Sequence, residues 1–242
     1  MNFGIIAAGE GSRLVQEGVS LPKPLVNIDG RPMIGRLIEI FISLGAECIS
    51  VIVNEQMTEV AEFLRKYEMP PECRLELVVK STPSSMHSFY ELGRLLRGRG
   101  RFVLTTVDTI FRREDFASYV KAFTEAPHGV EGMMAVTGFI DDEKPLYVRT
   151  DDRMDITGFL DTPAPGVKYI SGGIYGLDSR AIDVLDRCLE NGVSRMRNFQ
   201  RALVADGLHL KAFDMGKIID VDHASDIITA EKFISSGAQT EN

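Results

Sequence analysis

Short apolar runs alternate with amphipathic segments through the first half of the chain. The runs have the length of buried strands and occupy residues 3–8, 48–54, 73–80 and 101–107. The segments between them repeat apolar residues at helical spacing and occupy residues 33–44, 58–67 and 85–96. Strands that alternate with helices are typical of βα units in a parallel sheet. The pattern therefore predicts an α/β protein with a mixed, mainly parallel sheet flanked by helices.

The pattern changes near residue 131. Strand-like stretches broken by Gly, Pro and Asp follow at residues 133–140, 146–150 and 168–177. They predict a small antiparallel extension of the sheet. Further helices are expected at 179–190, 194–206 and 224–234, with a strand at 208–214. Since no repeat or linker divides the sequence, we expect a single domain over residues 1–242 with a frayed tail from about residue 235.

Composition then narrows the class of protein. The chain has 242 residues, 44% of them hydrophobic, and a formal net charge of −8. This is the balance of an ordinary globular protein, and the acidic charge argues against a nucleic acid as partner. Three cysteines without metal-ligand spacing favour a reduced, cytoplasmic setting. No stretch is long enough to cross a bilayer, so no membrane association is expected.

A glycine-rich segment follows the first predicted strand. Residues 8–14 read AGEGSRL, and small residues here let successive backbone N–H groups approach an anion at the carboxyl edge of the sheet. Glycines also serve tight turns without any ligand, so the segment alone is weak evidence. It is neither a Walker loop, since no lysine follows Gly11, nor a dinucleotide fingerprint, since Leu14 replaces the third small residue.

A second segment supplies a cation. Lys23 lies between Pro22 and Pro24, which restrict the backbone on both sides. A lone lysine in such a turn is usually solvated. Together with Arg13, however, it provides two positive charges beside a row of amides, which suits the triphosphate of an NTP. The combination therefore indicates a nucleotide site.

A carboxylate ends the fourth predicted strand. Asp108 follows the apolar run 103–107, at the edge of the sheet where the glycine-rich segment is expected. Mg²⁺ binds proteins through one or two carboxylates and takes its other ligands from water and substrate phosphates. The alternative is that Asp108 caps the following turn or helix. We favour Mg²⁺ as the cofactor because the nucleotide motifs lie at the same edge.

These motifs, in this order, resemble the signature of the sugar nucleotidyltransferase family. The resemblance rests on residues 7–14 (AAGEGSRL), 22–25 (PKPL) and 30–34 (GRPMI). It implies a Rossmann-like fold of the nucleotide-diphospho-sugar transferase type and transfer of NMP from an NTP to a phosphorylated acceptor. It also implies nucleotide contacts from Ala8, Gly9, Gly11, Ser12, Arg13 and Lys23. Arg13 and Lys23 are then the catalytic cations, which stabilise the leaving pyrophosphate.

The resemblance extends to the acceptor and to a second metal ligand. Residues 168–175 resemble the family's strand against the acceptor sugar, so Lys168, Gly172 and Gly173 become acceptor candidates. In the family a second metal carboxylate often precedes the last helix. In this sequence the corresponding residue is Asp220 or Asp222, and we favour Asp222 slightly as the metal ligand. The alternative is that Asp222 caps the last helix and Asp220 forms a surface ion pair.

Ser84 and Ser85 stand at the start of the helix after the third strand, beside the expected nucleotide site. Their hydroxyls are expected to contact the base or the ribose, although capping the helix is the commonest role of such serines.

The base, the acceptor and the assembly stay open at this stage. PKPL favours a sugar 1-phosphate or choline phosphate as acceptor, and family habit favours CTP or UTP as the NTP. The chain could form a homo-oligomer. The alternative function is that of a non-catalytic regulatory paralogue, which binds a nucleotide or a sugar phosphate without a reaction.

Overall fold

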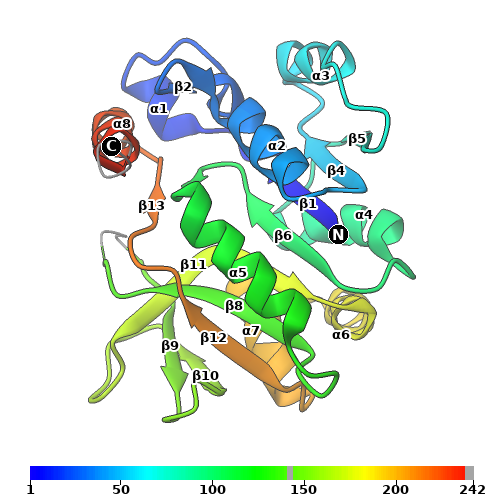
Figure 1. Cartoon of the computed structure of the whole chain (residues 1–242), viewed down its shortest axis with the longest axis vertical. Helices are drawn as coiled ribbons and strands as arrows, with labels where there is room; N and C mark the ends of the chain where they lie inside the picture. Colours follow the sequence, from blue (N-terminus) through cyan, green and yellow to red (C-terminus); the bar gives the residue numbers. More distant parts are fainter. Residues whose placement is uncertain (141–143, 238–242) are drawn as a thin grey trace.

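A computed structural model describes residues 1–140 and 144–237 of the chain. The strands of its main sheet are β1 (Asn2–Ala7), β4 (Cys48–Val53), β5 (Arg74–Val79), β6 (Phe102–Thr106), β8 (Gly132–Thr137), β9 (Tyr147–Thr150), β10 (Ile156–Leu160), β11 (Tyr169–Leu177) and β12 (Leu210–Asp214). Seven strands run in the order β10-β9-β11-β6-β1-β4-β5, and β8 pairs with both β11 and β12 (Figure 1). Two short pairs are separate from this sheet, β2 (Asn27–Ile28) with β3 (Arg31–Pro32) and β7 (Thr109–Ile110) with β13 (Ile219–Asp220).

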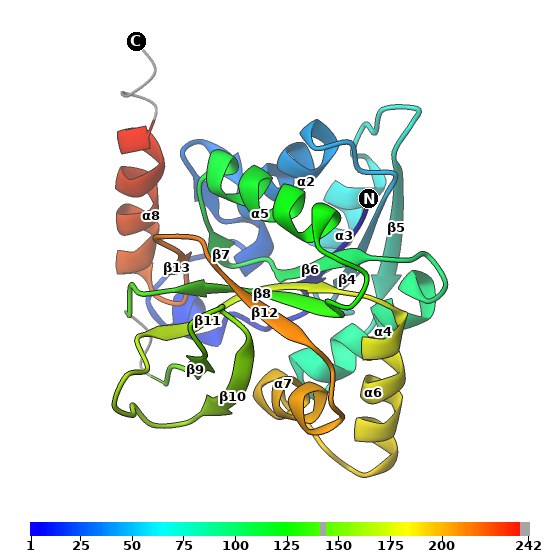
Figure 2. The ribbon, with the colours of Figure 1, turned by 60° about the horizontal axis from the view of Figure 1, so that its bottom comes forward.

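Helices cover both faces of the sheet. They are α1 (Ser12–Gln16), the 3-10 helix η1 (Lys23–Leu25), α2 (Met33–Ser43), α3 (Thr58–Arg65), α4 (Ser85–Leu96), α5 (Arg113–Glu125), α6 (Ser179–Glu190), α7 (Met196–Ala205) and α8 (Ala224–Gly237). α2, α3 and α5 lie on one face and α4, α6 and α7 on the other, while α8 stands at the side (Figure 2). Two hydrophobic clusters fill the two interfaces. None of these helices is both long and apolar enough to cross a membrane.

The parallel part of the sheet consists of β5, β4, β1 and β6. All residues of β1 and β4 are buried, as expected for parallel strands that are covered on both faces. Their register places Ala7 beside Val53 and Ile6 beside Thr106. The segments that follow β1, β4 and β6 therefore leave the sheet at one edge, where ligands of open α/β folds bind.

The α/β class with an antiparallel part is confirmed. β11 runs antiparallel to β6 and joins the two parts into one sheet. Helix α5 and strand β10 were not predicted, although Phe116, Tyr119, Val120 and Phe123 of α5 are buried at helical spacing. Residues 138–140, expected in a strand, lie beyond the end of β8.

The tail expected to fray from residue 235 is partly helical instead. α8 continues through residues 235–237 because Phe233 and Ile234 pack against one of the hydrophobic clusters. The rest of the expected tail, residues 238–242, lies outside the described residues.

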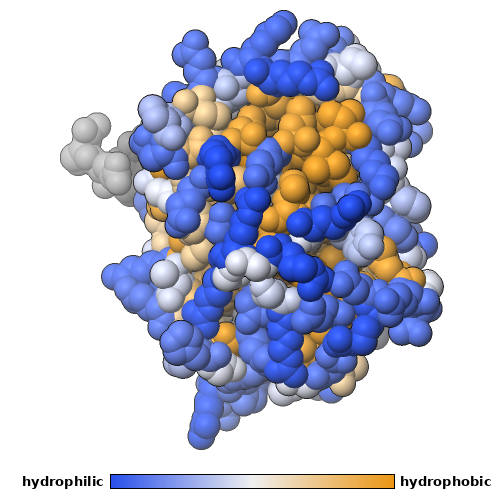
Figure 3. Space-filling model, turned by 90° about the vertical axis from the view of Figure 1, so that its right-hand side faces the viewer, coloured by the Kyte–Doolittle hydropathy of each residue, from blue (hydrophilic) through white to orange (hydrophobic). Residues whose placement is uncertain are grey.

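β5 forms one edge of the sheet, where it pairs with β4. Its residues Leu75, Leu77, Val78 and Val79 are partly exposed. Figure 3 faces the side of the molecule that carries α3 and β5 and shows a continuous hydrophobic area on it. The most apolar described surface in this view thus lies at the sheet edge, away from the segments that follow β6.

Candidate functional site

A cleft of 640 Å³ opens at the carboxyl ends of β1 and β6. Its walls come from the loop after β1, η1, the start of α4, the end of β6 and the segment before α8. Sequence-predicted residues that line it are Ala8, Gly9, Gly11, Ser12, Arg13, Lys23, Ser84, Ser85, Asp108 and Asp222. The fold thus gathers every predicted nucleotide residue, and two of the three predicted metal carboxylates, in one cleft.

Lys23 is the centre of this cleft. Its Nζ lies 2.6 Å from Oδ2 of Asp108 and 2.7 Å from Oδ1 of Asp222. The lysine side chain is only 8% exposed, whereas Asp108 is 25% and Asp222 46% exposed. One buried ammonium group therefore holds two carboxylates that come from distant parts of the chain.

Charge is balanced around this ammonium. Burial opposes the charged form of Lys23, but Asp108 and Asp222 outweigh it and raise the pKa of the lysine. Burial likewise opposes the charge on Asp222, but the hydrogen bond from Lys23, with further attraction from Arg13 and His223, lowers the pKa of this carboxyl. Lys23 and Asp222 are therefore both charged at neutral pH.

The glycine-rich loop is shaped to fit Lys23. Gly11 has φ +62°, and a Cβ at this position would lie 2.8 Å from Cβ of Lys23. Both the backbone conformation and the close approach therefore require glycine. A Cβ on Gly9, in contrast, would meet nothing within 4 Å. The loop at Gly9 is open to the cleft, as a backbone cradle for an anion requires.

Arg13 extends the cation pair toward solvent. Its Nη1 donates to Oδ2 of Asp222 at 2.8 Å, and its side chain is 48% exposed. Both cations therefore contact Asp222, and Lys23 also contacts Asp108.

Arg13→Ala is expected to lower turnover by about ten- to a hundredfold, because a charge-assisted contact to phosphate is lost. The free energy of unfolding should fall by less than about 1 kcal/mol, since the ion pair is half exposed. Steady-state kinetics and a thermal melt test this. Arg180→Ala is the matched control, because Arg180 forms an exposed ion pair with Glu131 away from the cleft. Wild-type turnover in Arg13→Ala would show that the arginine is only a solvated loop cation.

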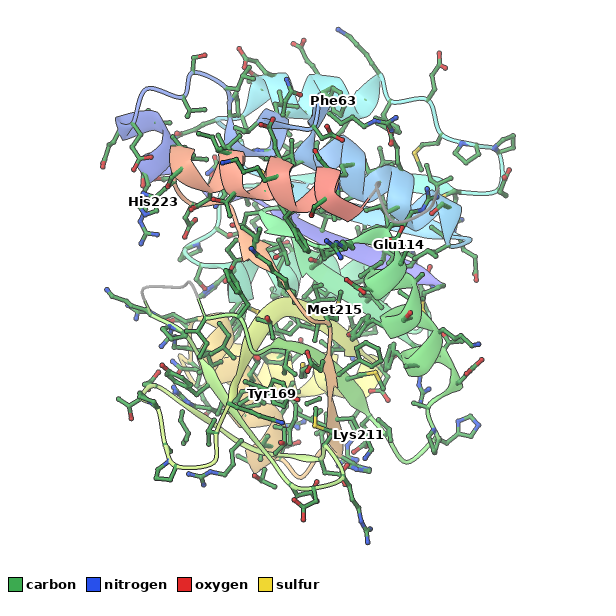
Figure 4. The ribbon with its side chains drawn as sticks, turned by 60° about the vertical axis from the view of Figure 1, so that its left-hand side comes forward. Phe63, Glu114, Tyr169, Lys211, Met215 and His223 are labelled. Carbon is green, nitrogen blue, oxygen red and sulfur yellow. The ribbon has the colours of Figure 1, made fainter. Side chains whose placement is uncertain are left out.

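The start of α8 is fixed by side chains other than Asp222. Oδ2 of Asp226 accepts from the backbone N–H of Asp222 and of His223 at 3.0 and 2.7 Å. Oε2 of Glu17, just after α1, accepts from the N–H of Ala224 at 2.6 Å, and its Oε1 lies 2.6 Å from Nδ1 of His223. His223 is visible at the first turn of α8, beside α1, in Figure 4. Helix capping therefore does not explain the position of the Asp222 carboxylate, which is turned to Lys23.

Asp220 occupies a different position from Asp222. Asp220 ends β13 and accepts from Oγ1 of Thr109 at 3.4 Å. It lines a smaller pocket beside the cleft, together with Asp222, His223 and Gly172. Asp222 lines both spaces, as Arg13 does, whereas Asp220 lines the smaller pocket and not the cleft. Of the two C-terminal carboxylates, Asp222 is therefore the one that the structure brings to Asp108.

The two cleft carboxylates fit a magnesium ion. In residues 1–140 and 144–237 no group of three or more His, Cys, Asp or Glu side chains is placed to hold a metal. Two carboxylates are nevertheless enough for Mg²⁺, which takes its other ligands from water and phosphate oxygens. Asp108 and Asp222 also share one lysine, which must give up part of these contacts to meet a phosphate. A second cation would then be needed to balance their charge.

The predicted acceptor residues are dispersed. Gly172 lines the smaller pocket, where close packing against Ile218 leaves no room for a Cβ. Gly173 has φ +72°, and a Cβ there would lie 2.8 Å from Oγ1 of Thr109, so it serves a backbone bend rather than a pocket wall. Lys168 is exposed, with its Nζ 5.0 Å from the centre of the Tyr169 ring, and it lines neither space. The structure therefore places Gly172 alone beside the candidate site.

Ser84 and Ser85 both line the cleft. Ser84 is the N-cap residue of α4 but makes no capping hydrogen bond, and its Oγ lies 2.8 Å from Nδ1 of His87. The double variant Ser84→Ala/Ser85→Ala is therefore expected to change the preference among NTPs by about a few-fold. The melting temperature of the protein should stay unchanged, because neither serine makes a capping hydrogen bond to α4. Competition assays between NTP pairs measure this. An unchanged preference would leave these serines without a part in nucleotide recognition.

Sequence reasoning missed Asn54. This buried residue follows β4 at the same edge of the sheet and lines the cleft. Its Nδ2 donates to the carbonyl oxygen of Ala8 at 3.4 Å, and its Oδ1 accepts from Oγ of Ser81 at 2.9 Å. Asn54 thus ties together the loops that follow three parallel strands. Its position at the carboxyl end of the second predicted strand was the available signal.

Known proteins share this sequence pattern. Residues 4–237 match the family model described as nucleotidyl transferase. A mannose-1-phosphate guanyltransferase of Schizosaccharomyces pombe is 30% identical over 233 residues, which cover 93% of this chain and 62% of the relative. The chain therefore spans less than two thirds of the length of this relative.

Solved structures share the fold. A Bacillus anthracis protein assigned as a glucose-1-phosphate thymidylyltransferase, in complex with sucrose, has a TM-score of 0.81 at 20% identity, covering 96% of this chain and 94% of that one. The inositol-1-phosphate CTP transferase of T. maritima has a TM-score of 0.74 at 18% identity, with 96% and 97% covered. Because the family model spans nearly the whole sequence, the chain belongs to the nucleotidyl transferase family.

Proposed function

We propose that the chain transfers a nucleoside monophosphate from an NTP to a sugar 1-phosphate or another small phosphorylated alcohol, such as choline phosphate, and releases pyrophosphate. The observation that carries this proposal is the buried Lys23 between Asp108 and Asp222, at the mouth of a glycine-rich loop. A phosphate-binding cation, amide groups and metal-binding carboxylates are the parts that this reaction requires. Membership of the family supports it.

The proposed reaction needs positioning and charge neutralisation. An oxygen of the acceptor phosphate attacks the α-phosphorus of the NTP and forms a new phosphoanhydride bond. The bond from the α-phosphorus to the oxygen that bridges the β-phosphorus breaks, and that oxygen leaves with the pyrophosphate. Lys23 and Arg13 hold the phosphates and offset the negative charge of the leaving group, and the backbone at Gly9 contributes N–H groups. No covalent intermediate with the protein is involved.

We further propose Mg²⁺ as the cofactor, held by Asp108 and Asp222. When bound, the ion would neutralise charge on the nucleotide phosphates. The carboxylates would orient it between the glycine-rich loop and the segment before α8. The same two carboxylates would orient the ammonium group of Lys23 toward the phosphates.

The base and the acceptor are part of the proposal. The relatives named above are a guanyltransferase, a thymidylyltransferase and a CTP transferase, so likeness alone does not select one base. The candidate substrate pairs are therefore CTP or UTP with a sugar 1-phosphate or choline phosphate. The guanyltransferase relative suggests a further pair, GTP with mannose 1-phosphate. Ser84, Ser85 and Asn54 are the cleft residues with polar groups suited to the base or ribose.

The test is pyrophosphate release from each of the four ribonucleoside triphosphates and dTTP, with and without Mg²⁺. Acceptors are mannose 1-phosphate, glucose 1-phosphate, inositol 1-phosphate and choline phosphate. We expect turnover with one pair that exceeds the others by at least about tenfold and requires the divalent ion. No turnover with any pair, together with measurable nucleotide binding by calorimetry, would overturn the enzyme proposal in favour of a regulatory paralogue.

A further inference from the structure

A second pocket, separate from the cleft, is rich in cations. It has a volume of 520 Å³ and is lined by Arg112, Lys217, Thr229, Lys232, Phe233 and Ser236. It lies between α8, the start of α5 and the segment that leads into β13. Figure 4 shows α8 crossing this side of the molecule, with Glu114 of the first turn of α5 beside its C-terminal half. Three cations and two hydroxyls face one space in a chain with a net charge of −8.

These cations are not neutralised by the acids that the structure describes. Nζ of Lys217 lies 4.2 Å from the ring centre of Phe139 and 5.6 Å from that of Phe233. The guanidinium of Arg112 lies 4.8 Å from the ring centre of Phe233. Aromatic faces attract cations but do not cancel their charge. Burial raises the pKa of Asp115, against the attraction of Arg112, and within the described part of the chain these two side chains form no ion pair.

Arg112 also keeps unused hydrogen-bonding capacity. Its Nη2 donates to Oγ of Ser236 at 3.2 Å, whereas its Nε is buried and has no acceptor among residues 1–140 and 144–237. A buried donor without an acceptor costs free energy, and guanidinium groups bind phosphate oxygens in pairs. The hydroxyls of Ser236 and Thr229 line the same pocket, and each donates its proton to a backbone carbonyl of α8, that of Phe233 and that of Ser225. The donors available to a ligand are therefore the three cationic side chains.

The register of the neighbouring strands brings two of the cations together. β7 and β13 are antiparallel, with Ile110 opposite Ile219. Arg112 follows this pair by two residues and Lys217 precedes it by two, and both side chains approach the Phe233 ring, at 4.8 and 5.6 Å from its centre. Like charges that lie beside one ring repel each other. An anion between them would remove this repulsion.

We propose that this pocket binds a phosphate-type oxyanion, either inorganic phosphate or the phosphate group of a small metabolite. The bound anion links Arg112 to Lys217 and so ties together the outer ends of β7 and β13. At the other end of this strand pair, the backbone N–H of Val221 donates to the carbonyl oxygen of Asp108 at 3.1 Å. The anion therefore steadies the segment that carries Asp108 and leads to Asp222, whatever chemistry the cleft performs.

Calorimetry with inorganic phosphate and with methyl phosphate, without nucleotide or metal, tests the proposal. Lys217→Gln/Lys232→Gln is expected to weaken binding at least about tenfold, because two charge-assisted contacts are lost. Lys121→Gln, which removes an exposed lysine from α5 outside the pocket, should bind like the wild type. Arg13→Ala separates this site from the nucleotide cleft and should also bind normally. Tighter binding of the ester than of inorganic phosphate would identify a metabolite as the ligand.

Thermal stability and hydrogen exchange provide a second, independent test of the proposal. Without phosphate, Lys217→Gln/Lys232→Gln should melt close to the wild type, because relief of the repulsion between cations opposes the loss of the cation–π contacts of Lys217. With phosphate, the melting temperature should rise for the wild type and stay constant for the double variant. Hydrogen exchange at the amides of Ile110 and Ile219 should slow in the wild type alone. Phosphate binding that survives the double substitution and is lost in Arg13→Ala would overturn the proposal.

Discussion

Lys23→Ala is expected to lower turnover by about 10²- to 10³-fold while the chain remains folded. Lys23 forms ion pairs with both Asp108 and Asp222, at 2.6 and 2.7 Å. Its loss removes a positive charge from the triphosphate and leaves two carboxylates facing the anionic nucleotide. Both the binding of the NTP and the stabilisation of leaving pyrophosphate should weaken. Steady-state kinetics at saturating acceptor would show the effect in kcat and in KM.

The same substitution has a defined effect on stability. The free energy of unfolding should fall by about 1–2 kcal/mol at neutral pH, less than for a fully buried pair because Asp222 is half exposed. The pKa of Asp222 is lowered in the folded chain, so its stabilising contribution is present above its unfolded pKa and is lost as the pH falls. The pKa of Lys23 is raised, so its contribution is lost only at high pH. The difference between wild type and variant should therefore be constant near neutrality and shrink at both extremes.

A matched control is Lys66→Ala, since Lys66 is exposed and forms only a long ion pair with Glu62, one helical turn away. It should keep both turnover and stability. Circular dichroism melts from pH 3 to pH 11, together with the rate assay, measure all three proteins. Near wild-type turnover in Lys23→Ala would remove the lysine from the reaction and leave it as a structural bridge between two acids.

Asp108→Asn and Asp222→Asn are each expected to raise the Mg²⁺ concentration for half-maximal activity by about ten- to a hundredfold, with a large fall in kcat. Both carboxylates contact Lys23 and line the cleft, whereas Asp220 lines only the smaller pocket. Asp220→Asn should therefore keep a Mg²⁺ titration curve close to that of the wild type. Asparagine keeps the size of the side chain and removes its charge, which isolates the metal contact from packing.

The structure also separates metal binding from helix capping at Asp222. Asp226 and Glu17 accept the first N–H groups of α8, so Asp222→Asn should not unfold this helix. Melting temperatures check this alongside the Mg²⁺ titration. Wild-type Mg²⁺ curves in both Asp108→Asn and Asp222→Asn would exclude these carboxylates as metal ligands. A shifted curve in Asp220→Asn alone would move the metal to the smaller pocket.

Local pattern was sufficient for most of the elements. The apolar runs at 3–8, 48–54 and 101–107 became β1, β4 and β6, because a continuous hydrophobic run fits a parallel strand that is covered on both faces. The run at 73–80 became β5, a partly exposed strand at the edge of the sheet. The motifs at the ends of these runs then had to meet, since parallel strands end at one edge of the sheet. Helix α5 was not predicted, although its buried residues Phe116, Tyr119, Val120 and Phe123 have helical spacing.

Sequence alone thus determined the α/β class, the glycine-rich loop and the residues that could neutralise a triphosphate. The tertiary structure decided which of them act together. Lys23 and Asp222 are 199 residues apart and meet only because β13 pairs with β7, which follows Asp108. The same pairing ends at Asp220 and turns the chain, so that Asp222 faces the lysine and Asp220 faces the neighbouring pocket. Periodicity records which side chains are buried, but the contacts between distant segments depend on strand order and register, which no local pattern specifies.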